Sequence, residues 1–261
     1  FIPKKQILDS RKLSIKGLKI VNDKIFISFV DEIQKDCWNT SLISADFKSN
    51  ILVFEKVFYH EECINRLNNL DNEFEAWQSG GEIEELNNKE ILLSIGDYRL
   101  RHLAQDKNSL NGKIIKINLE TNETDIISMG HRNPQGLYFD QENNFLLETE
   151  HGPQGGDEIN LIKLNGDTTP NYGWAIASYG EHYGGRKHFN DAKYIKYPLL
   201  KSHVDHGFIE PLTYFVPSIG IGKIVGLGNK KYVATAMKNQ SIYFFNLNFE
   251  NKIDNLERIY I

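Results

Sequence analysis

The sequence predicts an all-β fold, built from antiparallel sheets that repeat along the chain. Three observations support this prediction. Apolar and β-branched residues alternate or cluster over short runs, polar turns rich in Asn, Asp, Lys and Gly separate the runs, and the pattern recurs four times. Repetition of this kind is typical of β-propellers, in which similar sheets, the blades, stand around a common axis.

The first two repeats lie in the N-terminal half of the chain. In the first, residues 17–29 form a pair of apolar runs around a polar turn, and residues 39–47 follow as a further strand. In the second, the pair covers residues 80–97 and the further strand covers residues 112–120. Each pair predicts two antiparallel strands joined by a tight turn.

The last two repeats follow the same plan. The third has its pair at residues 135–152 and its further strand at 157–166, and the fourth has them at 220–237 and 240–248. A propeller of this length often forms one unit. We therefore expect a single, partial propeller domain over residues 1–261, with about four blades.

Two stretches depart from this pattern. In residues 60–77 Ile64, Leu67 and Leu70 recur at helical spacing, which predicts either a short connecting helix or an irregular loop. Residues 181–210 show no sustained period and contain His182, His188, His203 and His206. A connection this long inside a compact domain is usually functional or poorly ordered.

Composition limits the classes of partner. The 261 residues are 40% hydrophobic and 11% aromatic, which is ordinary for a globular domain. The formal net charge of −5 disfavours nucleic-acid binding, which needs concentrated Lys and Arg. No apolar run approaches the roughly 20 residues of a membrane span.

The ends and the cysteines leave some alternatives open. Cys37 and Cys63 either pair in an oxidising compartment or remain two unrelated thiols. The chain begins Phe1-Ile2-Pro3, without Met and without the apolar region of a signal peptide. We therefore expect it to be a processed or excised piece.

The densest chemistry lies between Gly130 and Gly180, where two turns rich in Gly, Pro and charge flank one short apolar run. Arg132 offers a fixed fork of donors for carboxylates, and Asn133 can donate and accept. Gly152 and Pro153 expose carbonyl oxygens that suit a hard cation such as calcium. The alternative is a β-hairpin with a solvated loop.

Three linked motifs decide between these interpretations. GHRNPQG at 130–136, EHGPQGGDEINLI at 150–162 and NYGW at 171–174 resemble, in order and spacing, the signature of the soluble glucose dehydrogenase and aldose sugar dehydrogenase family. The resemblance implies a six-bladed β-propeller that uses pyrroloquinoline quinone and calcium. It also implies that the first and last blades are missing or incomplete here, which leaves open edges for another segment or chain to cover.

The resemblance implies roles for several residues. The carbonyl groups of Gly152 and Pro153 would bind calcium, while Arg132 and Asn133 would contact the quinone. Lys238, in TAMKNQ, matches a lysine contact of the family, and His151 stands beside the calcium turn. The family's further arginines would lie beyond the end of this sequence.

The substrate side departs from the family. A general base must take the proton of the sugar hydroxyl, and the family uses a histidine in an HQSG-like stretch. This sequence has Trp77 there, and an indole cannot accept a proton. Asp97 matches the acid that orients the histidine, and Asp157 matches a substrate-side aspartate. His102 and His151 are the nearest substitutes along the sequence.

Two functions therefore compete. One is a quinone-dependent sugar dehydrogenase with a sugar substrate and an external electron acceptor, periplasmic or secreted by resemblance. The alternative is a non-catalytic propeller that binds a protein or a glycan, because the fold serves both uses. A metal site at His203, Asp205 and His206 is a weaker candidate, because a loop lacks the helix that makes His-x-x-His pairs converge.

Overall fold

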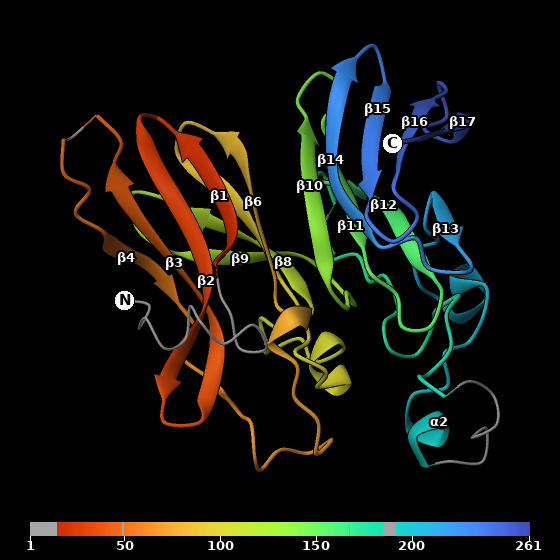
Figure 1. The fold of residues 1–261 in the computed structure, drawn as a ribbon, viewed down its shortest axis with the longest axis horizontal. Coiled ribbons are helices and arrows are strands. Elements are labelled where there is room, and N and C mark those ends of the chain that lie inside the picture. The colour runs from red at the N-terminus through yellow and green to blue at the C-terminus, as the bar shows by residue number, and fades with distance from the viewer. Residues whose placement is uncertain (1–14, 49, 167, 185–191) are drawn as a thin grey trace.

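The computed structural model describes residues 15–48, 50–166, 168–184 and 192–261, which form four antiparallel sheets side by side in chain order (Figure 1). The first has strand order β1-β2-β3-β4, with β5 paired to β3: β1 (Ile15–Val21), β2 (Lys24–Gln34), β3 (Cys37–Asp46), β4 (Glu55–Tyr59) and β5 (Ile64–Asn65). The second is β6 (Gly80–Asn87), β7 (Glu90–Ile95), β8 (Lys113–Asn118) and β9 (Thr124–Met129).

The remaining two sheets repeat this up-and-down order. The third is β10 (Pro134–Asp140), β11 (Phe145–Glu150), β12 (Asp157–Lys163) and β13 (Thr213–Phe215). The fourth is β14 (Ile221–Gly228), β15 (Lys231–Ala236), β16 (Ser241–Leu247) and β17 (Ile253–Tyr260). The prediction of four antiparallel propeller blades is confirmed. The arrangement is not closed into a ring (Figure 1).

An apolar layer fills each of the three junctions between neighbouring sheets. Phe26 and Leu42 pack against Ile83 at the first junction, and the second and third hold similar clusters of buried residues. Burial of such side chains stabilises by about 1.5–3 kcal/mol each. The strands predicted from apolar runs are therefore the ones that form the core.

A hydroxyl group also bridges each junction close to the innermost strands, which are the first strands of the sheets (β1, β6, β10 and β14). Ser28 donates to the carbonyl of Gly81, Ser94 to that of Pro134 and Thr149 to that of Gly222. Glycine is needed here because a Cβ on Gly136 would lie 2.8 Å from the oxygen of Gly222. These short side chains let the backbones of adjacent sheets approach each other.

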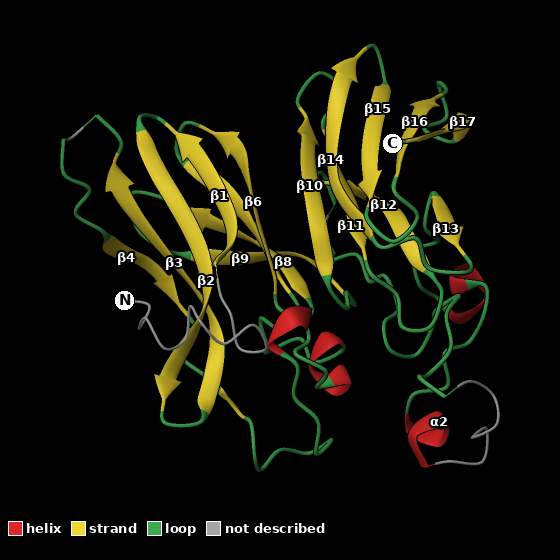
Figure 2. Ribbon diagram, in the orientation of Figure 1, coloured by secondary structure: helices red, strands yellow, loops and turns green. Residues whose placement is uncertain are grey.

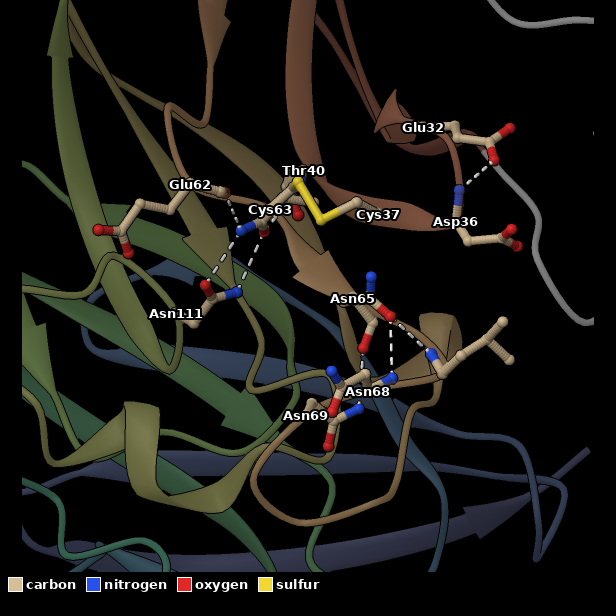
Figure 3. Close-up of a disulfide and its surroundings, with 12 residues drawn as sticks. Glu32, Asp36, Cys37, Thr40, Glu62, Cys63, Asn65, Asn68, Asn69 and Asn111 are labelled. Carbon is tan, nitrogen blue, oxygen red and sulfur yellow. Dashed lines mark hydrogen bonds between the residues drawn. A yellow bond between two sulfur atoms is a disulfide. The ribbon is translucent and has the colours of Figure 1, made fainter.

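The segment around residues 60–77 does not form an α-helix. Cys63 is joined to Cys37 by a disulfide, and β5 pairs with the start of β3 (Figure 3). The side chain of Asn65 accepts hydrogen bonds from the backbone of Leu67 and Asn68, which competes with helical hydrogen bonds. The loop alternative is thus correct, and a 3₁₀ turn at Ala76–Gln78 ends the segment.

The long connection between β12 and β13 contains a short helix, α2 (Ala192–Lys196), and a 3₁₀ turn at His203–His206, among the few helical turns that Figure 2 shows. His188 lies outside the described residues. Among the described residues, no helix is both long and apolar enough to cross a membrane.

Candidate cofactor pocket

A cavity of about 1100 Å³ lies where the loops from all four sheets converge. Its walls come from segments that are far apart in sequence. They include Lys16, Glu75, Trp77, Gln78, Arg99, Arg132, Asn133, His151, Gly152, Pro153, Asp157, Tyr183, Gly220 and Lys238. The structure thus brings together the residues predicted to bind the quinone and calcium, together with Trp77 and Asp157.

The predicted calcium turn is held in place by Asp157, the first residue of β12. Its Oδ1 accepts a hydrogen bond from the backbone N–H of Gly152 at 3.1 Å. Its Oδ2 accepts from the backbone of Ile219 (2.9 Å), Gly220 (2.7 Å) and Ile221 (3.3 Å). The carboxylate therefore ties the 150–157 turn to the start of the fourth sheet. Its substrate role stays a prediction.

Arg132 is buried against the same turn. One guanidinium nitrogen donates to the carbonyl oxygens of His151 and Gly152, both at 2.8 Å, and the other lies 3.3 Å from the hydroxyl of Tyr183. The guanidinium also stacks over the ring of Trp174, 5.4 Å from the centroid. The backbone N–H of Arg132 donates to Glu150 at 2.6 Å, which fixes the start of the side chain.

His151 and Asn133 are also engaged with the backbone. His151 Nε2 lies 2.6 Å from the carbonyl oxygen of Ile221, and because a carbonyl only accepts, this nitrogen carries the proton. Burial lowers the pKa of His151, which favours the neutral ring. Asn133 Oδ1 accepts from the backbone of Gly80 at 3.1 Å, which joins the cofactor motif to the second sheet.

The opposite wall holds Trp77 and Gln78, and Asp97 is buried behind them. The side chain of Trp77 is 56% exposed, whereas Gln78 is buried. With the Gln78 amide oriented to satisfy both of its ends, Nε2 donates to Asp97 Oδ1 at 3.2 Å and Oε1 accepts from Arg132 at 2.9 Å. Asp97 also accepts from the indole N–H of Trp174 at 2.7 Å. Burial raises the pKa of Asp97, against the lowering effect of Arg132.

The other histidine candidates lie elsewhere. His102 is not part of the cavity wall, and its Nδ1 lies 3.4 Å from Asp71. His203 is buried, whereas Asp205 and His206 are exposed, so the structure does not bring these three together. The sequence prediction passed over Gln78 and Arg99. The backbone of Tyr98 and Arg99 is left-handed, with φ of 51° and 74°, and Arg99 lines the cavity. No simple pattern in the sequence indicates this backbone conformation.

Comparison with known proteins places these features in a family. Over 155 residues, 54% of this chain and 38% of the relative, the sequence is 29% identical to the aldose sugar dehydrogenase YliI of Escherichia coli. Over 93 residues, 31% of this chain and 18% of the relative, it is 38% identical to the quinoprotein glucose dehydrogenase B of Acinetobacter calcoaceticus. The matched part spans less than half the length of either relative.

The fold is shared with a solved structure. The structure superposes on the crystal structure of the soluble aldose sugar dehydrogenase of Escherichia coli in the apo form with a TM-score of 0.72, at 23% identity, over 91% of this chain and 68% of that one. The family model for glucose/sorbosone dehydrogenases matches residues 21–261. The chain therefore belongs to the glucose/sorbosone dehydrogenase family.

Proposed function

We propose that the cavity binds pyrroloquinoline quinone and calcium, as in a quinone-dependent sugar dehydrogenase, but lacks an efficient general base. The observation that carries the proposal is the position of Arg132. Its guanidinium lies against the carbonyl oxygen of Gly152, in a cavity that Asn133 and Lys238 also line. A side chain that can bind the carboxylates of the quinone thus lies beside a turn whose carbonyl groups can bind calcium.

The residues present fit calcium. A carbonyl oxygen has two lone pairs, so the oxygen of Gly152 keeps one beside its hydrogen bond from Arg132. The oxygen of Pro153 has only a long contact of 3.5 Å, with Ser218 Oγ. Two carbonyl groups are too few for calcium, which takes six to eight oxygens. The remaining ligands would come from the quinone and water.

The residues also fit a tricarboxylate quinone. Arg132 provides a fork of donors and Lys238 a second cationic group, and neither forms an ion pair among the described residues. The carboxylates of the cofactor would neutralise both of these positive charges. When bound, the quinone supplies the acceptor for the hydride of an aldose, by resemblance to the family, and an external acceptor would then reoxidise it.

The proton side is the weak part of the site. Neither Trp77 nor Gln78 can act as a general base, because an indole only donates and an amide does not take up a proton near neutral pH. Gln78 contacts Asp97, the residue that would orient a histidine by resemblance to the family. We therefore propose Trp77 as the position where the base has been lost, beside Gln78, which matches the glutamine of the HQSG-like stretch.

Two features favour the alternative of a propeller that binds a partner. The base is absent, and the innermost strands of the first and fourth sheets expose apolar residues such as Leu18 (53%) and Leu227 (56%). In this alternative, a protein partner covers these faces. The disulfide between Cys37 and Cys63 supports a periplasmic or secreted location, because disulfides persist in oxidising compartments.

Titration of the folded chain with the quinone in millimolar calcium tests the proposal. We expect saturable binding and a higher melting temperature, because the ligand binds only the folded turn. Arg132→Met should weaken quinone binding about 10- to 100-fold, since a hydrogen bond to a charged group contributes about 1.5–3 kcal/mol. Arg258→Met, on the outermost strand β17, is the control and should bind normally. A folded chain without saturable binding would exclude the quinone function.

A further inference from the structure

A second group of ionisable residues lies in the interior of the third sheet, beside the proposed quinone site, to which Glu150 is joined by the hydrogen bond from the backbone N–H of Arg132. His131, Glu148 and Glu150 are all buried, with exposed fractions of 0%, 0% and 4%. His131 Nδ1 lies 3.4 Å from Glu150 Oε1 and 3.9 Å from Glu148 Oε2. We propose that these three side chains, with Asn160, bind a divalent transition-metal cation of the zinc type.

The charges of this group are not balanced by protein groups. Among the described residues no lysine or arginine side chain forms an ion pair with Glu148 or Glu150. Glu148 Oε1 is buried without any hydrogen-bond partner. Burying carboxylates without a counter-charge is unfavourable by several kcal/mol per ion. A cation between the two carboxylates removes this cost.

The spacing fits first-row metal coordination. Zinc binds imidazole nitrogen and carboxylate oxygen at about 2.0–2.2 Å, so two ligands of a tetrahedral site lie about 3.4 Å apart. The observed separations of 3.4 and 3.9 Å are close to this value. All three ligand atoms lie within 4.8 Å of one another. Side-chain rotations that draw these atoms together would close the site.

Asn160, on β12, is the second and independent indication. Its Nδ2 lies 2.9 Å from Glu148 Oε2 and 3.3 Å from Glu150 Oε1, while its Oδ1 is buried without a donor. Turning the amide over breaks the two hydrogen bonds from Nδ2 to the carboxylates, which bonds to the cation would replace, and brings Oδ1 to the place where Nδ2 lies. Asn160 would then complete a set of one nitrogen and three oxygens, which suits zinc or manganese.

The outer side of His131 supports the same assignment. Its Nε2 lies 2.8 Å from Ser128 Oγ, and the ring stacks on Tyr172 with centroids 4.9 Å apart. A metal-bound imidazole usually donates its other N–H to an oxygen nearby, which fixes the ring and its tautomer. Ser128 can accept this hydrogen bond, so that the lone pair of Nδ1 faces the carboxylates.

Metal analysis of the purified chain tests the proposal without any need for turnover or quinone, so its outcome is separate from that of the proposed function. The chain is stripped with a chelator, loaded with Zn²⁺ in the presence of excess Ca²⁺, and desalted. We expect about one equivalent of zinc to remain, and about 100-fold excess of Zn²⁺ over the dissociation constant to raise the melting temperature by about 5–10 °C. Co²⁺ should give the intense visible absorption of a four-coordinate site.

Glu148→Gln is the test variant and Glu142→Gln, on the exposed β10–β11 turn, is the matched control. Glu148→Gln should lose the retained zinc, because an amide is a poorer zinc ligand than a carboxylate. Glu142→Gln should retain zinc. Glu150→Gln replaces the first variant if that one does not fold. A folded, unmodified chain that retains no zinc, or zinc retained equally by Glu148→Gln, would overturn the proposal.

Discussion

The two walls of the cavity differ in how the chain holds them. On the cofactor wall, Asp157 anchors the 150–157 turn through four backbone hydrogen bonds, and Arg132 lies on two carbonyl groups of that turn. On the opposite wall, Gln78 joins Asp97 through one amide, and Trp77 is largely exposed. The cofactor wall is therefore part of the framework that connects the third and fourth sheets, whereas the opposite wall is joined to it through the hydrogen bond from Arg132 to Gln78.

This difference predicts which wall tolerates substitution. Replacement of a residue such as Asp157 destabilises the fold as well as the site, because buried backbone groups lose their partner. Replacement of an exposed side chain at position 77 affects little besides chemistry. The loss of a base is thus compatible with a stable chain, and a retained cofactor turn does not by itself demonstrate catalysis.

The largest expected effect is on the cofactor wall. Asp157→Ala leaves four backbone N–H groups without their acceptor, and we expect it to lower the free energy of unfolding by about 3–5 kcal/mol. Denaturant titration measures this change. Asp205→Ala, at an exposed position, is the control and should change the free energy by less than about 0.5 kcal/mol. A similarly small effect at position 157 would show that the cofactor wall is not structural.

A somewhat smaller effect is expected on the opposite side. The disulfide between Cys37 and Cys63 closes a loop of 26 residues in the segment that leads to Trp77. The Cys37→Ser/Cys63→Ser variant should lose about 3 kcal/mol of stability, because the unfolded chain gains freedom. Quinone affinity should stay within about twofold of the unmodified chain, because the cofactor wall is held by other contacts. A large loss of affinity would mean that the two walls are coupled.

Much of the fold could be predicted from the sequence because strands and turns leave local signals. The four paired apolar runs became the four sheets, with the polar turns between their strands. The segment at 60–77 was ambiguous because two effects oppose its helical spacing. The side chain of Asn65 competes for backbone hydrogen bonds, and a disulfide joins Cys63 to Cys37. Helical spacing alone could not show that competition.

The site was predictable where motifs are contiguous and less so where it is assembled from distant segments. Arg132, Gly152 and Pro153 lie in one motif-rich stretch, and the structure places them on one cavity. Gln78 could not be recognised, because its contact with Arg132 depends on how the second sheet packs beside the 130–133 turn. Likewise, Asp157 accepts hydrogen bonds from the backbone of residues 219–221, more than 60 positions away, and the local sequence does not indicate this contact.

The most direct test compares turnover of an aldose by three chains, each saturated with quinone and calcium: the unmodified chain, Trp77→His and Gln78→His. Quinone saturation is checked by absorbance, so that loss of cofactor is not mistaken for loss of the base. We predict slow turnover by the unmodified chain, a gain of about 10²- to 10⁴-fold in Trp77→His, which restores a histidine at the position that the resemblance gives to the base, and a smaller gain in Gln78→His. Turnover by the unmodified chain equal to that of both variants would contradict the claim that the base is missing.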